Sequence, residues 1–167
     1  GPSRLAVQNL TCALENQSAP AFLPSEEAVL LTVGPSSDPN RPPGLVRVQV
    51  STGEFEYLFK DPWFSDYRPI SVSPDGRWLT LQSDESGTGE IYVQPFPGPG
   101  RRWQLSTGGG FFPVWSRDGS EIFFRDGQGQ LSHVAVSAGT DFDAGVPEAL
   151  FPLAVGTGNS VRKFVVS

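Results

Sequence analysis

The sequence predicts an all-β fold built from repeated small sheets. Three features point to it: a motif that recurs along the chain, tight-turn signals at regular spacing, and many residues that break helices. The 167 residues include 19 glycines and 16 prolines, which fall too often for long helices. Short runs of β-branched and aromatic residues lie between these breakers, and such runs favour strands.

One motif recurs at intervals of about 40 to 50 residues. Its two clearest copies are ISVSPDGRWLTL at residues 70–81 and PVWSRDGSEIFF at residues 113–124, which are 43 positions apart. An eroded copy, PAFLPSE, occupies residues 20–26, and a further copy, FVVS, occupies residues 164–167. A fixed period of this length is typical of repeat architectures, in which each repeat is one supersecondary unit.

Each copy is expected to begin a unit of four short strands. Its Asp-Gly pair follows a β run and predicts a hairpin, because glycine accepts a positive φ without steric cost. A second β run follows the turn, then a polar loop, a third strand, and a short fourth strand after a Gly/Pro-rich loop. This order is typical of a β-propeller blade. Trp78 and Trp115 lie in the strands that flank the Asp-Gly turns and are expected to be core residues of their blades. The expected second, third and fourth strands are residues 29–33, 45–50 and 55–59, then 78–82, 90–94 and 103–105, then 122–124, 131–136 and 148–151.

We therefore predict a β-propeller segment of three four-stranded antiparallel blades within one domain, residues 1–167. In the first copy Ser25-Glu26 replaces Asp-Gly, so a wider turn is expected there. The predicted parts are an outer strand left from a preceding blade at 4–11, blades at about 19–59, 69–106 and 112–151 with innermost strands near 19–23, 69–73 and 112–116, and the start of a further blade at 162–167.

The run SPDGRWLT at residues 73–80, followed by GEIYV at 89–93 and WQLS at 103–106, resembles the WD40-like repeat of TolB-type β-propellers. The stretch 69–151 is especially similar to the propeller region that lies C-terminal to bacterial Ser/Thr kinase domains. The resemblance extends over about 110 residues and implies the propeller fold. Because propellers serve many functions, it predicts no single activity.

Composition and charge exclude several kinds of partner. The net charge is −6 and the 12 lysines and arginines are scattered, so the chain lacks the basic stripe that nucleic-acid binding needs. The longest apolar run, residues 28–33, is far shorter than a membrane span, and no membrane insertion is expected. The single cysteine, Cys12, excludes an internal disulfide and a cysteine-based zinc site. It leaves the compartment open, whereas the TolB resemblance favours a periplasmic or other extracytoplasmic location.

The chain has one histidine, His133, and so only one centre around which a Ser-His-Asp triad could form. It could serve as a general base for Ser132 or another hydroxyl. The alternative, which we favour, is a hydrogen-bonded structural histidine between blades. The sequence has no Gly-x-Ser-x-Gly elbow. We predict no catalytic residue, no metal and no cofactor in this chain, and therefore no enzymatic activity of its own.

Other polar segments have structural explanations. Asp75 and Asp118 are expected to accept hydrogen bonds from the backbone N–H groups of their turns. The acidic loop at residues 84–90 is spaced faintly like a calcium loop, but it lacks the alternating ligands and the final bidentate glutamate, so we favour a solvated turn. The GGG at residues 108–110 could suggest a phosphate cradle. No Lys-Ser/Thr pair follows it, so we favour a flexible link between blades.

The segment that joins the first two blades is the strongest candidate for binding. It carries two large rings, a phenol, two carboxylates and an arginine, on the face of a propeller where ligands usually dock. The alternative is that Trp63 and Phe64 fill the groove between blades. Phe111 and Phe112 occupy the equivalent junction of the next blade, a position that favours packing. The candidate binding residues are Asp61, Trp63, Phe64, Asp66, Tyr67, Arg68, Phe111 and Phe112.

The leading functional hypothesis is a non-catalytic scaffold that binds a protein or peptide, as the sensor or interaction part of a bacterial kinase-like protein. The alternatives are the accessory propeller of a prolyl-oligopeptidase-like hydrolase and a TolB-like periplasmic component of an envelope complex. Three blades cannot close a ring, because propellers normally need about four to eight. We therefore expect open apolar faces on the first and last blades. Either the chain self-associates head to tail, most simply as a dimer, or further blades complete the ring in the full protein.

Overall fold

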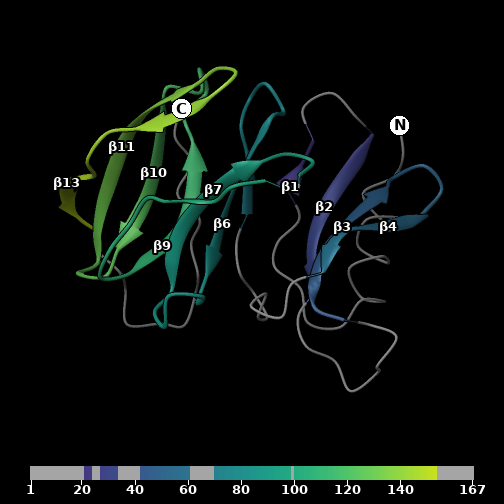
Figure 1. Cartoon of the computed structure of the whole chain (residues 1–167), viewed down its shortest axis with the longest axis horizontal. Coiled ribbons are helices and arrows are strands. Elements are labelled where there is room, and N and C mark those ends of the chain that lie inside the picture. The colour runs from purple at the N-terminus through teal and green to yellow at the C-terminus, as the bar shows by residue number, and fades with distance from the viewer. Residues whose placement is uncertain (1–20, 24–26, 34–41, 61–69, 99, 154–167) are drawn as a thin grey trace.

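The structure is a computed structural model that describes residues 21–23, 27–33, 42–60, 70–98 and 100–153. These residues form three antiparallel sheets that stand side by side in chain order, without any helix among them (Figure 1). The prediction of an all-β propeller segment with three blades is confirmed. The predicted strands at 4–11 and 162–167, and the turn at Ser25-Glu26, lie outside the described residues.

In the first two sheets, and for β9, β10 and β11 of the third, strands that are consecutive in the chain are antiparallel neighbours. Their bounds agree with the predicted strands to within two residues, and β12 is an additional strand that the sequence did not predict. The first sheet contains β1 (Ala21–Phe22), β2 (Ala28–Val33), β3 (Gly44–Gln49) and β4 (Phe55–Lys60). The second sheet contains β5 (Ile70–Val72), β6 (Trp78–Ser83), β7 (Glu90–Pro95) and β8 (Trp103–Gln104). The third sheet contains β9 (Gly110–Trp115), β10 (Glu121–Asp126) and β11 (Gln130–Ala138), and both β12 (Phe142–Ala144) and β13 (Glu148–Pro152) pair with β11.

The two Asp-Gly turns are closed by the hydrogen bonds that the sequence predicted. Oδ1 of Asp75 accepts the N–H of Arg77 at 3.1 Å, and Oδ1 of Asp118 accepts the N–H of Ser120 at 3.1 Å. The glycine after each aspartate has a φ of 73° or 75°, which other residues rarely adopt. The Asp-Gly pair therefore fixes the same tight turn in the second and the third blade. In each blade the turn sets the register of the first two strands.

An apolar core holds the first sheet against the second. Its residues come from β2, β3 and the residue after β1 on one side, and from β5, β6 and β7 on the other. Every residue of β2 and of β6 is buried, so the central strands are covered on both of their faces. The buried members of this core are Leu23, Ala28, Leu30, Leu45, Ile70, Leu79, Leu81 and Tyr92.

A second core lies between the second and third sheets and contains the two tryptophans that the sequence placed there. Trp78 is 5% exposed and Trp115 is 6% exposed, which confirms that prediction. Phe142, on the unpredicted strand β12, lies 5.3 Å from Trp78 and 5.4 Å from Trp103 between ring centroids. Strand β12 thus closes one side of this core with an aromatic ring. The other buried members are Ile91, Val93, Leu105, Ile122, Phe124 and Val134.

The link between the second and third sheets is tied down by a buried carboxylate. Glu90 accepts hydrogen bonds from the Oγ of Ser106 and, at 2.9 Å, from the N–H of Gly109. A Cβ on Gly109 would lie only 2.9 Å from the Cα of Gly127, so the link packs directly on the β10–β11 turn. The link expected to be flexible is therefore held in place. Glu90, expected in a solvated turn, is instead buried in β7 because it binds this link.

The outer face of the first sheet is buried within the chain. Its apolar cluster is at most 3% exposed at every member. This finding corrects the expectation that the first blade presents an open apolar face, since that face is already removed from water, as the hydrophobic effect favours. The members are Val29, Leu31, Val33, Val46 and Val48.

Trp115→Ala should lower the free energy of unfolding by roughly 3–5 kcal/mol, because it removes a large ring from the core between the second and third sheets. Urea titration followed by circular dichroism measures the change. Phe55, which is 56% exposed on β4, provides the matched control, and Phe55→Ala should change stability by no more than about 0.5 kcal/mol. A loss below about 1 kcal/mol for Trp115→Ala would show that the ring contributes little to the core.

Candidate interaction site

The third sheet packs on the second sheet with only one of its faces. Ile122, Phe124 and Val134 point into the shared core. Side chains alternate along a strand, so the residues between these positions point the opposite way. We call this opposite side the distal face of the third sheet.

Strand register arranges the distal face in three rows, because directly opposed residues of antiparallel strands point to the same side. The first row crosses one end of the sheet, the second crosses its middle, and the third lies at the other end. The rows are Phe111, Arg125, Leu131 and Phe151, then Val114, Phe123, His133 and Glu148, then Glu121 and Ala135.

Arg125 in the first row is a cation that no carboxylate of the described residues neutralises. Its guanidinium lies over the ring of Phe111, 5.4 Å from the centroid. Its Nε is buried and has no hydrogen-bond partner. A guanidinium stacked on an aromatic ring keeps its in-plane donors available for a carboxylate. The geometry therefore suits a carboxylate that arrives from outside the sheet.

Phe112, next to this cation, has a strained backbone. Its φ is 57°, which is uncommon for a bulky residue. The register between β9 and β10 shifts here, so that Phe112 and Pro113 together lie opposite Phe124. Such bulges redirect side chains and occur often near functional sites, where strain of this kind also collects. The rings of Phe111 and Phe112 are 6.4 Å apart.

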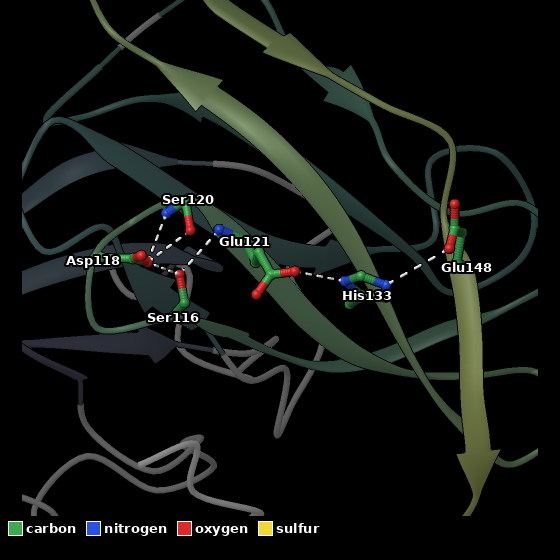
Figure 2. A network of polar contacts seen from close by, with 6 residues as sticks. All are labelled: Ser116, Asp118, Ser120, Glu121, His133 and Glu148. Carbon is green, nitrogen blue, oxygen red and sulfur yellow. Dashed lines mark hydrogen bonds and ion pairs between the residues drawn. The ribbon is translucent and has the colours of Figure 1, made fainter.

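His133 lies in the middle row between two glutamates (Figure 2). Its Nδ1 is 2.8 Å from Oε1 of Glu121, and its Nε2 is 4.0 Å from Oε2 of Glu148. Its ring stacks on Phe123, with centroids 5.9 Å apart and planes inclined by 22°. The histidine thus connects β10, β11 and β13. The predicted hydrogen bonding is confirmed. Val134, not His133, takes the position on β11 that faces the second sheet, so a position of His133 between blades stays a prediction.

The same network reaches the turn between β9 and β10 (Figure 2). The N–H of Glu121 donates to Oγ of Ser116 at 3.0 Å, and that hydroxyl donates to Asp118 Oδ1 at 2.7 Å. Hydrogen bonds from Ser116 Oγ and from the N–H and Oγ of Ser120 lower the pKa of Asp118 to about 2. An ionised Asp118 therefore fixes the turn that positions Glu121 at the start of β10.

The arrangement favours binding over catalysis. Both ring nitrogens of His133 face carboxylates rather than a nucleophilic hydroxyl. Ser132, the neighbouring hydroxyl in sequence, donates to Oδ2 of Asp126 at 2.9 Å, on the core side of the strand. Among the residues that the structure describes, no group of three or more His, Cys, Asp or Glu side chains is placed to hold a metal ion.

Strand β13 borders the distal face and exposes all five of its residues. Leu150 is 46% exposed and Phe151 is 53% exposed. Its outer edge pairs with no strand of the described part of the chain. Exposed apolar side chains beside an unpaired strand edge are typical of surfaces that associate with another chain.

Three cavities lie elsewhere on the structure, and each is lined by charged side chains that already have partners within the chain. The largest, about 860 Å³, lies beside the β3–β4 hairpin, where Arg47 already pairs with Glu56 at 2.8 Å. One of about 380 Å³ lies between the glycine-rich link and the β10–β11 turn, where the carboxylate of Asp126 binds its own turn. One of about 370 Å³ lies between the two Asp-Gly turns, where both aspartates are likewise occupied.

The structure places only part of the site predicted from sequence. Phe111 and Phe112 belong to β9 and not to the junction before it, because β9 already begins at Gly110. The sequence analysis missed Arg125 and Phe123, although the alternation along β10 offered a signal. The other six candidates lie outside the described residues, and their binding role stays a prediction; they are Asp61, Trp63, Phe64, Asp66, Tyr67 and Arg68.

Comparison with solved structures shows the fold. TolB from Acinetobacter baumannii is 22% identical with a TM-score of 0.57, over 85% of this chain and 33% of that one. A chain of the nidogen/laminin complex is 17% identical with a TM-score of 0.55, over 81% of this chain and 50% of that one. A putative TolB from Agrobacterium tumefaciens is 15% identical with a TM-score of 0.55, over 80% of this chain and 49% of that one. The chain thus spans half or less of these relatives, and at such identities the likeness establishes the β-propeller fold alone.

No protein-family model matches the sequence, and no curated protein matches it. Within the described residues, no helix has the length and apolar character needed to cross a membrane.

Asp118→Asn should lower the free energy of unfolding near neutral pH, and the loss should shrink as the pH falls from about 4 to about 2. A carboxyl whose pKa lies lower in the folded chain than its ordinary value of 3.8 adds stability above that value, and this contribution disappears as the pH falls through about 2. Urea titrations of both proteins at several pH values measure the difference.

Asp143→Asn, at an exposed position on β12, is the control for this measurement. It should leave stability nearly unchanged at every pH. A loss for Asp118→Asn that stays constant across the acid range would contradict the link between Asp118 ionisation and folding.

Proposed function

We propose that the chain is a non-catalytic propeller segment that binds a protein or peptide through the distal face of the third sheet. The observation that carries the proposal is Arg125, which stacks on Phe111 and has no carboxylate partner among the described residues, on a face where strand register also places Phe123 and Phe151. Arginine and aromatic side chains supply much of the binding energy of protein interfaces. One of the similar structures is itself a complex of two proteins.

The sheet holds this face in a defined shape. Its opposite side packs on the core that contains Trp78 and Trp115, and the buried Glu90 ties down the link that leads into β9. Side chains that are positioned in advance lose less conformational entropy when they bind. This support suits a recognition surface. The predicted aromatic patch at residues 61–68 would add a second contact region.

Finer hypotheses concern the protein to which the segment belongs. It could be the interaction part of a kinase-like protein, the accessory propeller of a peptidase, or a TolB-like extracytoplasmic component. The full-length gene product distinguishes them. A kinase catalytic loop upstream favours the first hypothesis, and a hydrolase nucleophile elbow downstream favours the second.

Selection of a random peptide library displayed on phage against the immobilised chain should enrich one family of related sequences. Arg125→Ala and Phe111→Ala should each weaken the binding of a synthetic member of that family about tenfold or more, because both remove a side chain from the centre of the face. Fluorescence anisotropy measures the affinity.

Phe55→Ala, which removes an exposed ring from β4 of the first sheet, should leave peptide affinity unchanged. The proposal fails if no sequence family is enriched, or if the selected peptides bind the Arg125 and Phe111 variants as tightly as the original chain.

The purified chain should not turn over peptide, ester or nucleotide substrates, because His133 faces two carboxylates instead of a nucleophile. Spectrophotometric assays with generic substrates of each class test this. Turnover that His133→Ala abolishes, in a protein whose circular dichroism is unchanged, would overturn the non-catalytic assignment.

A further inference from the structure

We infer that the partner of the distal face is a second copy of this chain, bound through the same face with two-fold symmetry. The inference rests on the proposed binding role of that face and names its partner. It differs from the head-to-tail ring expected from the sequence, in which the last blade of one copy meets the first blade of another.

The burial of the first sheet argues against the head-to-tail arrangement. Its outer apolar cluster, which includes Leu31 and Val48, is already buried inside the chain, so it offers no free face to the third sheet of a neighbour. The distal face, by contrast, has half-buried Phe111 and Phe123 and a border at β13 where all five residues are exposed, although Leu131 on this face is buried. An interface that uses this face on both copies must be isologous, with each residue meeting its partner reciprocally.

Charges along β10 fit such a contact. Arg125 lies at one end of the strand, without a carboxylate partner among the residues that the structure describes, and Glu121 lies at the other end. Near Glu121, two carboxylates share the one imidazole of His133, so this end carries excess negative charge. The cation and the anion are about 13 Å apart along the strand, from four residues at about 3.3 Å each. Arg125 therefore has no carboxylate partner in the described part of the chain, and the carboxylates near Glu121 outnumber the one imidazole beside them.

A two-fold axis that lies between the two faces, perpendicular to β10 at the level of Phe123, supplies that partner. It reverses the strand direction, so that Arg125 of each copy meets the partner subunit's Glu121. It also brings Phe123 of both copies together at the centre, where an aromatic pair can pack. Two Arg–Glu contacts then flank one aromatic contact, which gives the complementary pattern that specific interfaces show.

The size of the face sets the expected strength. Four strands spaced about 4.8 Å apart and about six residues long span roughly 15 by 20 Å. Each copy therefore buries several hundred Å² at most, at the low end for specific interfaces. We expect a weak dimer whose population rises with protein concentration, rather than an obligate one.

Sedimentation velocity over a wide concentration range tests the inference with the full chain. The original protein should shift from monomer to dimer. Arg125→Glu and Glu121→Arg should each raise the dissociation constant about tenfold or more, because each places like charges opposite one another twice per dimer. The double variant carrying both changes should restore most of the affinity, because the two charges have exchanged ends.

Two charge-matched controls separate the contact from net charge. Arg117→Glu, in the exposed β9–β10 turn, and Glu54→Arg, exposed near β4, change the net charge by the same amounts and should leave the dimer intact. Circular dichroism checks that each variant folds. If Arg125→Glu does not fold, Arg125→Gln removes the attraction without adding repulsion and should still weaken the dimer measurably.

The outcomes distinguish this inference from the broader binding role. A chain that stays monomeric at millimolar concentration overturns the inference, and its distal face is then covered by a further propeller blade or another protein. A dimer that the single variants do not weaken, or that the double variant does not restore, overturns the two-fold geometry. A dimer without any peptide ligand leaves the inference standing and rejects general peptide binding, and a monomer that binds selected peptides does the reverse.

Discussion

A four-stranded sheet that is apolar on both faces must be covered twice, and this requirement organises the molecule. Every residue of the central strands β2 and β6 is buried, which no isolated sheet can achieve. Each sheet therefore takes its neighbour as a cover. One core joins the first and second sheets and another joins the second and third. The last sheet in such a stack keeps one face that the other two sheets do not cover, and this face carries Arg125, His133 and their aromatic neighbours.

Polar interactions decide where that face begins and how it is shaped. Buried Glu90 holds the glycine-rich link, and the ionised Asp118 holds the turn that starts β10. The bulge at Phe112 then brings Phe111 opposite Arg125 instead of shifting the whole row by one residue. A one-residue slip would send each of these side chains to the other side of the sheet. The distal face thus depends on a few hydrogen bonds located at its ends.

The chemistry of the face fits the proposed recognition role. Its one histidine is held between carboxylates and stacked on an aromatic ring, so it braces three strands instead of activating a hydroxyl. Arg125, which has no carboxylate partner in the described part of the chain, lies over an aromatic ring and keeps donors for an incoming carboxylate. The similar structures, at 22% identity or less, share the fold with this chain, and a propeller fold hosts many functions. The function must therefore be argued from the face itself.

The sequence by itself determined the features that arise from near neighbours in the chain. Alternating β runs, Asp-Gly turns and a constant period predicted the strands, the hydrogen bonds of Asp75 and Asp118, and the burial of Trp78 and Trp115. Only the tertiary structure decided which sheet face no other described sheet covers, because burial depends on the neighbouring sheet and not on the strand alone. It also decided that Glu90 is buried, that Phe142 closes a core from β12, and that Arg125 lacks a carboxylate partner among the described residues. These outcomes join residues that are far apart in sequence, and no local pattern encodes such contacts.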